Sequence, residues 1–293
     1  MAEPLDPRVT PARPDLAAAS LRGKVQAASW AEPRRRVVST PVAPMTAAPD
    51  AEAPTTTHLL FGEEIDIYDA KAGWAWGQAT ADGYVGYVPD ACLSAPGAAP
   101  GWRVSALQAP VYPAPTIRSR PVSALPFGAR VAAQPEGQFL SLAAGGYLCA
   151  QHASPASEPE PDWVDVATRF LGAPYIWGGR TAAGIDCSGL IQIARQAAGA
   201  ACPRDSDMQA AEPGRPVTRG RERRGDLIFW RGHVGVMLSP TRLLHATGRR
   251  MAVVIEHLPA VEALIEAAGH GPVIARRRWS PPNLSLAAPS ALG

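Results

Sequence analysis

The residue best suited to chemistry in this chain is the cysteine of GIDCSGL (184–190). Asp186 is a favourable N-cap residue, so Cys187 is expected in or beside the first turn of a helix that ends at Gly199. Free backbone N–H groups and the helix dipole at that position favour a thiolate and can receive an oxyanion. A single cysteine at a helix start is more often a packed small residue, so this motif by itself only suggests a nucleophile.

A thiol nucleophile needs a base, and two of the six histidines are placed to supply one. His233 begins an apolar strand in GHVGV (232–236), and His245 lies in LLHAT (243–247), on the expected returning strand of a hairpin. Both imidazoles should therefore lie near one end of that hairpin, where one takes the thiol proton and the other orients it. Either histidine alone is readily explained as a strand residue, whereas both together with Cys187 favour nucleophilic catalysis.

The remaining cysteines and histidines show no pattern typical of a metal site. No CxxC spacing occurs, which argues against a zinc ribbon, and no metal or organic cofactor is required. A zinc site made from Cys187, His233 and His245 is an alternative, but it lacks paired ligand spacing. The other residues of these two types are expected in the core (Cys92, Cys149, Cys202) or as ordinary surface and loop residues (His58, His152, His257, His270).

Composition excludes several classes of function. The formal net charge is +2 and 18% of the 293 residues are charged, so nucleic acid is not an expected partner. No uncharged run of about 18 apolar residues occurs, which argues against a membrane span. The start, MAEPLDPRVTPARPDLAAAS, lacks the basic residues and apolar run of a secretory signal, so we expect a cytoplasmic location.

The sequence predicts short strands followed by a mixed region. Aromatic and β-branched segments interrupted by Gly, Asp and Pro indicate small antiparallel barrels, and a helix followed later by several strands indicates an α+β domain. The predicted segments are a Pro/Ala-rich leader (1–35), a first barrel (36–97), a second barrel (98–153), a linker (154–161), the α+β domain (162–280) and a C-terminal tail (281–293).

Within the α+β domain, the pattern predicts a helix that Asp162 caps and Gly172 ends, then the helix that begins at Cys187. A third helix is expected at 260–268. The expected strands of the antiparallel sheet are 226–230, 233–238, 243–247, 251–258 and 272–279.

A series of motifs in this domain, in order and spacing, resembles the NlpC/P60-type cysteine peptidases of bacterial cell-wall metabolism. The motifs are PYIWGG (174–179), GIDCSGLIQ (184–192), PRDSDMQ (203–209), RGDLIFW (224–230), GHVGV and LLHAT. The resemblance covers about 160–280 and implies a papain-like α+β fold with a Cys–His–His triad. It implies that Cys187 is the nucleophile, His233 the general base and acid, and His245 the orienting residue.

The two barrels resemble the bacterial SH3-like domains of γ-D-glutamyl–diamino acid endopeptidases of the dipeptidyl-peptidase VI type. That resemblance implies a first barrel that packs over the cleft and selects a free N-terminal L-Ala. The positions that it matches to substrate contacts are Asp186, Ser188, Ser206, Tyr84 and Tyr175. Tyr87, where related chains often have Trp, is a less favoured candidate than Tyr84. A first-barrel carboxylate beside the substrate amine is also implied, with Glu52, Glu63 and Glu64 as candidates.

These matches have simpler alternatives. Asp186 can act as a helix cap alone, and the hydroxyls of Ser188 and Ser206 can bond to the local backbone. The function that the sequence predicts is hydrolysis of the bond between γ-D-Glu and a diamino acid, meso-diaminopimelate or L-Lys. The expected partner is a peptidoglycan-derived peptide, L-Ala-γ-D-Glu-diamino acid, in cell-wall recycling. The alternatives are an amidase or acyltransferase on the same scaffold and a non-catalytic cell-wall binding protein.

Overall fold

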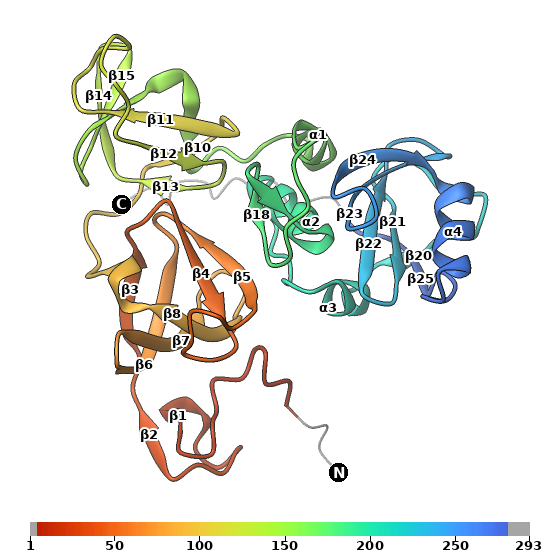
Figure 1. Ribbon diagram of the computed structural model, residues 1–293, viewed down its shortest axis with the longest axis horizontal. Helices are drawn as coiled ribbons and strands as arrows, with labels where there is room; N and C mark the ends of the chain where they lie inside the picture. The colour runs from red at the N-terminus through yellow and green to blue at the C-terminus, as the bar shows by residue number, and fades with distance from the viewer. Residues whose placement is uncertain (1–4, 281–293) are drawn as a thin grey trace, which may run out of the picture.

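The computed structural model describes residues 5–280, so the predicted tail at 281–293 lies outside the described residues. Two all-β parts lie on one side of the molecule and a mixed α/β part on the other (Figure 1). The described part of the leader runs below the first barrel. It contains a short parallel pair formed by β1 (Leu16–Ala18) and β2 (Ser29–Ala31), with a 3-10 turn at Ala19–Leu21. No helix within 5–280 is long and apolar enough to cross a membrane.

The first barrel is a seven-stranded sheet with the order β5-β4-β8-β7-β6-β3-β9. Alternate residues of these strands point inward and form a core of their own, with Met45, Ile65 and Val88 fully buried. Its strands are β3 (Arg34–Val38), β4 (Val42–Thr46), β5 (Thr55–Leu60), β6 (Glu64–Lys71), β7 (Trp74–Ala79), β8 (Val85–Pro89) and β9 (Leu93–Ser94).

The second all-β part has a three-stranded sheet (β13-β10-β17), a five-stranded sheet (β12-β11-β16-β15-β14) and a separate core. Its last strand extends two residues into the segment predicted as a linker. The strands are β10 (Trp102–Val104), β11 (Gln108–Tyr112), β12 (Ser123–Pro126), β13 (Arg130–Val131), β14 (Ala133–Glu136), β15 (Phe139–Leu142), β16 (Tyr147–Cys149) and β17 (Ala153–Pro155). We retain the predicted limits of both barrels as proposed domain boundaries.

The third part is an antiparallel six-stranded sheet, in the order β20-β25-β21-β22-β23-β24, with α2 on one face and α4 on the other (Figure 1). The α+β class is confirmed, with an all-β N-terminal half. The helices of this third part are α1 (Trp163–Arg169), α2 (Cys187–Ala197), α3 (Ser206–Ala211) and α4 (Leu258–Ala267). Its strands are β18 (Arg180–Thr181), β19 (Gly184–Ile185), β20 (Arg215–Pro216), β21 (Leu227–Trp230), β22 (His233–Met237), β23 (Arg242–Thr247), β24 (Ala252–His257) and β25 (Ala275–Arg278).

The helix boundaries follow from local chemistry. The Asp162 carboxylate accepts from the backbone N–H of Val164 at 2.8 Å, and Asp186 accepts from that of Gly189 at 2.7 Å, so each acid satisfies a free donor at a helix start. Gly172 follows α1 with φ of 85°, a conformation that glycine adopts without strain. The sequence pattern did not predict α3 or the β18–β19 hairpin, and α4 begins two residues before its predicted start.

The first barrel and the α+β part share a polar interface. The β5 backbone N–H of His58 donates to the Gly178 carbonyl at 2.9 Å, and the Arg180 guanidinium donates to the His58 carbonyl at 2.8 Å. Arg180 also binds both carboxylate oxygens of Glu63 at 2.9 Å. His58, predicted as an ordinary surface or loop residue, is therefore an interface residue, and its burial lowers the pKa of its imidazole.

Candidate active site

Cys187 is the first residue of α2, and only 6% of its surface is exposed. Its Sγ lies 3.9 Å from the carbonyl oxygen of Gly232, the residue before His233. Burial and, secondarily, the Asp186 carboxylate raise the pKa of the thiol to about 12, against the lowering effect of the N–H groups of Val234 and Ser188. Desolvation therefore favours the neutral thiol over the thiolate. This differs from the expectation that the helix start favours a thiolate, because the cost of desolvation is larger.

The two histidines form one hydrogen-bonded chain that continues to a glutamate. His233 Nε2 lies 2.9 Å from His245 Nδ1, and His245 Nε2 lies 3.0 Å from Oε2 of Glu256. Burial lowers the pKa of His233 to about 3, and burial also lowers that of His245. Burial opposes ionisation of Glu256, but its bonds with Arg249 and His245 lower the pKa of the carboxyl below its usual value. At neutral pH the chain is two neutral imidazoles and one carboxylate.

The tautomers follow from this hydrogen-bond network. Glu256 can only accept, so His245 carries its proton on Nε2 and presents the lone pair of Nδ1 to His233. His233 must then carry its proton on Nε2, which leaves its Nδ1 unprotonated. That is the form a general base requires. Glu256 was missed in the sequence; the register that pairs His245 with Val254 places it on the same face of the sheet as His245, two residues further along β24.

A cavity of about 240 Å³ opens over Cys187 and is lined by both the barrel and the α+β part. It brings together every residue that the sequence matched to substrate contacts. The lining residues are Asp186, Cys187, Ser188, Tyr175, Trp177, Asp205, Ser206, Asp207 and Gly232 from the α+β part, Thr56 and Tyr84 from the first barrel, and Arg8 from the leader.

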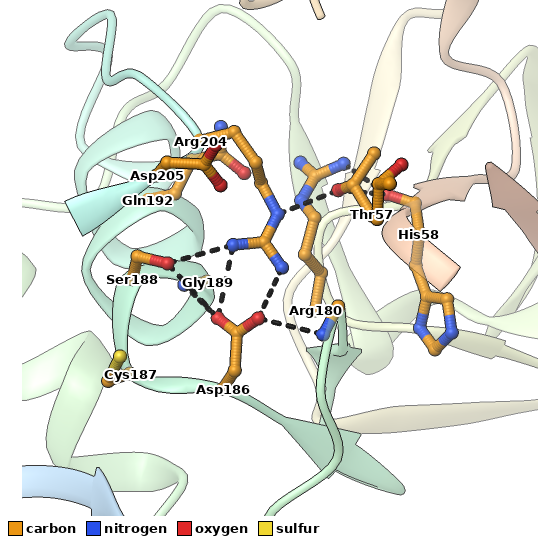
Figure 2. Close-up of polar contacts among 12 residues, drawn as sticks. Thr57, His58, Arg180, Asp186, Cys187, Ser188, Gly189, Gln192, Arg204 and Asp205 are labelled. Carbon is orange, nitrogen blue, oxygen red and sulfur yellow. Dashed lines mark hydrogen bonds and ion pairs between the residues drawn. The ribbon is translucent and has the colours of Figure 1, made fainter. Parts of the chain in front are cut away.

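A buried arginine fixes the start of α2 (Figure 2). Arg204, 1% exposed, binds both Asp186 oxygens at 3.1 and 2.6 Å and the Ser188 hydroxyl at 2.9 Å. Its Nε donates to Thr57 Oγ1 of the first barrel at 2.7 Å. Asp186 also accepts from the backbone N–H of Gly178 at 2.9 Å, so both carboxylate oxygens are engaged. These bonds favour the cap role of Asp186 over a contact with a substrate amine. Arg204 lies in the PRDSDMQ motif, but the sequence analysis assigned it no role, because an arginine in a loop does not reveal its burial.

Besides Asp186, the acidic groups of the cavity come from the start of α3, where Asp205 and Asp207 both bind Arg8. The Tyr84 hydroxyl donates to Asp205 Oδ2 at 3.0 Å, and burial followed by the charge of Asp205 raises the pKa of Tyr84. None of the first-barrel glutamates considered from the sequence lines the cavity. Glu63 binds Arg180, Glu64 binds Arg35, and Glu52 lies exposed. The acid implied beside the amine is therefore better matched by Asp205 than by a barrel glutamate.

A second cavity of about 530 Å³ lies on the other side of the histidine pair, between β24 and α4. It shares Tyr175 and Gly232 with the Cys187 cavity, so the two cavities meet beside Cys187 and His233. Its walls are mainly apolar, with Arg231 and Arg249 among the polar groups. Within the described residues, no group of three or more His, Cys, Asp or Glu side chains is arranged to hold a metal ion.

A cysteine at a helix start, packed on an antiparallel sheet that carries its histidine pair, is the layout of papain-like cysteine peptidases. Residues 172–261 match the NlpC/P60 family, and residues 45–93 match the bacterial dipeptidyl-peptidase Sh3 domain. The chain therefore contains an NlpC/P60 cysteine peptidase domain and, before it, a bacterial dipeptidyl-peptidase SH3 domain.

Three proteins with sequences similar to this chain are named dipeptidyl-peptidases. The chain is 38% identical over 84 residues to dipeptidyl-peptidase 6 of Lysinibacillus sphaericus, an alignment that covers 29% of this chain and 31% of that protein. It is 35% identical over 115 residues to the gamma-D-glutamyl-L-lysine dipeptidyl-peptidase of Bacillus subtilis, covering 36% and 37%. It is 27% identical over 247 residues to the Bacillus cereus protein of that name, covering 73% of each. It thus spans about a third of the length of the first two relatives.

The fold also has a counterpart among solved structures. A crystal structure of an NlpC/P60 family protein from Bacillus cereus has a TM-score of 0.71 and 21% sequence identity, covering 85% of this chain and 100% of that one. This likeness extends over the barrels as well as the peptidase part, because it covers most of both chains.

Proposed function

We propose that this protein is a cysteine peptidase that hydrolyses the γ-D-glutamyl–diamino acid bond of short peptidoglycan peptides with an unblocked N-terminal L-Ala. One observation carries the proposal: Thr56 and Tyr84 of the first barrel form one wall of the cavity over Cys187, and Asp205 lies there beside Tyr84. An ammonium group in a closed cleft needs such an acidic partner, because an unpaired charge is costly there. The names of the relatives support the same reaction.

The first chemical step forms a thioester. His233 takes the proton from Cys187 as the sulfur attacks the γ-carbonyl carbon of D-Glu, and backbone N–H groups at the start of α2 stabilise the oxyanion. The buried neutral thiol and neutral imidazole mean that proton transfer accompanies the attack. His233 then gives its proton to the amine of the departing diamino acid as the C–N bond breaks.

Water completes the cycle. His233 removes a proton from water, which attacks the thioester carbonyl, and the C–S bond breaks with return of the proton to Cys187. L-Ala-γ-D-Glu is released. Throughout, Glu256 keeps His245 in the tautomer that accepts from His233, and its charge stabilises the cation that forms on the histidine pair.

Substrate recognition divides between the two cavities. The L-Ala ammonium pairs with Asp205, while the hydroxyls of Ser188 and Ser206 bind the D-Glu portion and Tyr175 borders the scissile bond. The diamino acid leaves toward the cavity beside α4. A peptide with an unblocked L-Ala has already been released from the glycan, so this substrate class fits recycling, and the cytoplasmic location stays a prediction.

The test is a product assay by mass spectrometry on L-Ala-γ-D-Glu-meso-diaminopimelate and on its N-acetylated form. We expect L-Ala-γ-D-Glu and free diamino acid from the first peptide and much slower cleavage of the second. Equal rates would refute selection of a free amine. An acyltransferase would instead join the glutamyl group to an added amine, and a binding protein would retain the peptide uncleaved.

A further inference from the structure

The described leader connects two sites on the first barrel. We propose that residues 6–15 are an intramolecular ligand of this barrel, with Arg13 as its anchor, and that Arg8 is a specificity-determining residue of the Cys187 cavity. The proposal rests on the proposed function, because it explains how the unblocked amine is selected. It gives the leader a direct part in substrate choice.

The anchor site is an aromatic groove on the first barrel, a cavity of about 640 Å³ between the barrel and the leader. The Arg13 guanidinium stacks 4.4 Å from the Trp76 ring centre and donates to Asp69 at 2.8 Å and to the Tyr87 hydroxyl at 3.1 Å. Only 19% of the Arg13 side chain is exposed. A guanidinium that both stacks on an indole and pairs with a carboxylate is held more firmly than one on an open surface.

Backbone bonds then set the position of the leader beside the cavity. The N–H of Val85 donates to the Arg8 carbonyl at 2.7 Å, and the Gln78 side chain donates to the Val9 carbonyl at 2.9 Å. Val85 follows Tyr84, which lines the cavity. Arg8 is therefore fixed in register with the tyrosine that contacts Asp205.

The Arg8 side chain reaches across to the α+β part. Its guanidinium donates to Asp205 at 2.8 Å and to both oxygens of Asp207 at 2.9 and 2.7 Å, and it also binds Asp6. Arg8 and Tyr84 share the same oxygen, Oδ2, of Asp205. Two donors, one from the leader and one from the first barrel, thus orient this carboxylate of the α+β part, and the other oxygen is left to receive the substrate ammonium.

Charge and shape give this end of the cavity its selectivity. One guanidinium faces the three carboxylates of Asp6, Asp205 and Asp207, so the net charge is negative and a further cation is accepted. An acylated amine has no charge to offer, and its added atoms extend toward the Arg8 guanidinium. The site therefore favours a peptide that ends at its L-Ala amine.

The experiment compares the ratio of kcat/KM for the free and N-acetylated tripeptides in the full-length wild type, Arg8→Ala and Arg13→Ala. A ratio within one preparation is independent of the folded fraction. We expect Arg8→Ala to lower the ratio roughly ten-fold, as loss of a charged hydrogen-bond partner implies. Arg13→Ala should lower it about three-fold by releasing the anchor.

Arg22→Ala is the matched control. Arg22 belongs to the same leader and stacks on Trp30, away from both cavities, so this variant should keep the wild-type ratio. An unchanged ratio in Arg8→Ala overturns the proposal, and so does faster cleavage of the free peptide, which would mean that Arg8 obstructs the cavity. Failure of the wild type to cleave the free peptide would instead refute the proposed function.

Discussion

The function that we propose gives the cleft a chemical side and a recognition side, and the two sides are built differently. The chemical side, with Cys187, His233, His245 and Glu256, comes from one part of the chain, and short hydrogen bonds join His233, His245 and Glu256 across three adjacent strands. The recognition side joins Arg8, Tyr84 and Asp205 from three separate regions. This difference indicates that the reactive residues all come from one domain, whereas substrate selectivity depends on how the domains and the leader are assembled. Substitutions on the first side should lower kcat, and those on the second should raise KM.

The largest expected effect is that of Cys187→Ala. Removal of the nucleophile should lower kcat by at least about 10⁴-fold, because no other group can form the thioester. The measurement is product formation from the free tripeptide under single-turnover conditions, with a thermal melt to verify folding. Cys92→Ala, a half-buried thiol of the first barrel, should keep full activity as a control. More than a tenth of wild-type activity in Cys187→Ala would refute the mechanism.

Glu256→Gln should have the next largest effect. A Gln amide can donate to His245 and reverse the tautomers of both imidazoles, so kcat should fall roughly 10²-fold at unchanged KM. The kcat–pH profile should also change, which a purely structural role would not produce. Glu262→Gln is the matched control, since Glu262 binds Arg219 and Arg276 and does not contact the histidines. A rise in KM alone would contradict this role and would show that Glu256 acts in substrate binding.

Asp205→Asn tests the recognition side. We expect the KM of the free tripeptide to rise roughly ten-fold with little change in kcat, because a charged hydrogen bond to the ammonium is lost. Cleavage of the N-acetylated peptide should not change. Asp165→Asn, which alters a surface pair with Arg224 on α1, serves as the control. A fall in kcat for both peptides would show that Asp205 acts on the chemistry.

The smallest expected effect is a loss of folding stability at low pH. Histidines on both sides of the cleft should contribute to it. Burial lowers the pKa of His58 on the recognition side, and of His233 and His245 on the chemical side. Below pH of about 6.5 these histidines become protonated in the unfolded chain but stay neutral in the folded protein. The unfolded state therefore binds more protons, and the free energy of unfolding falls as pH decreases toward 3. Each histidine contributes at most about 1.4 kcal/mol per pH unit. Denaturant titrations should show a smaller slope for His58→Gln, and an equal slope would exclude His58 from this effect.

The sequence located the residues that we propose for the chemical side more completely than those of the recognition side, for a physical reason. Cys187 and the histidine pair lie in short motifs whose helix-start and strand patterns are local. Glu256 depended on the register between β23 and β24, which the strand pattern alone does not specify. The contact between Arg8 and Asp205 spans 197 positions, so no local pattern could predict it. The fold class was predicted because alternation and turn residues are repeated in many segments, whereas the six residues of α3 were too few to give a periodic signal.

The buried arginines at the interface have a consequence for folding cooperativity. Arg180 and Arg204 are each 1% exposed, and each has partners in both the first barrel and the peptidase part. If the two parts separated, Arg180 would lose its buried ion pair with Glu63 and Arg204 would lose its hydrogen bond to Thr57, so these contacts couple the stability of the two parts. The barrel and the peptidase part should therefore unfold in a single calorimetric transition. A peptidase part expressed without its barrel would be a less stable protein as well as a less selective one.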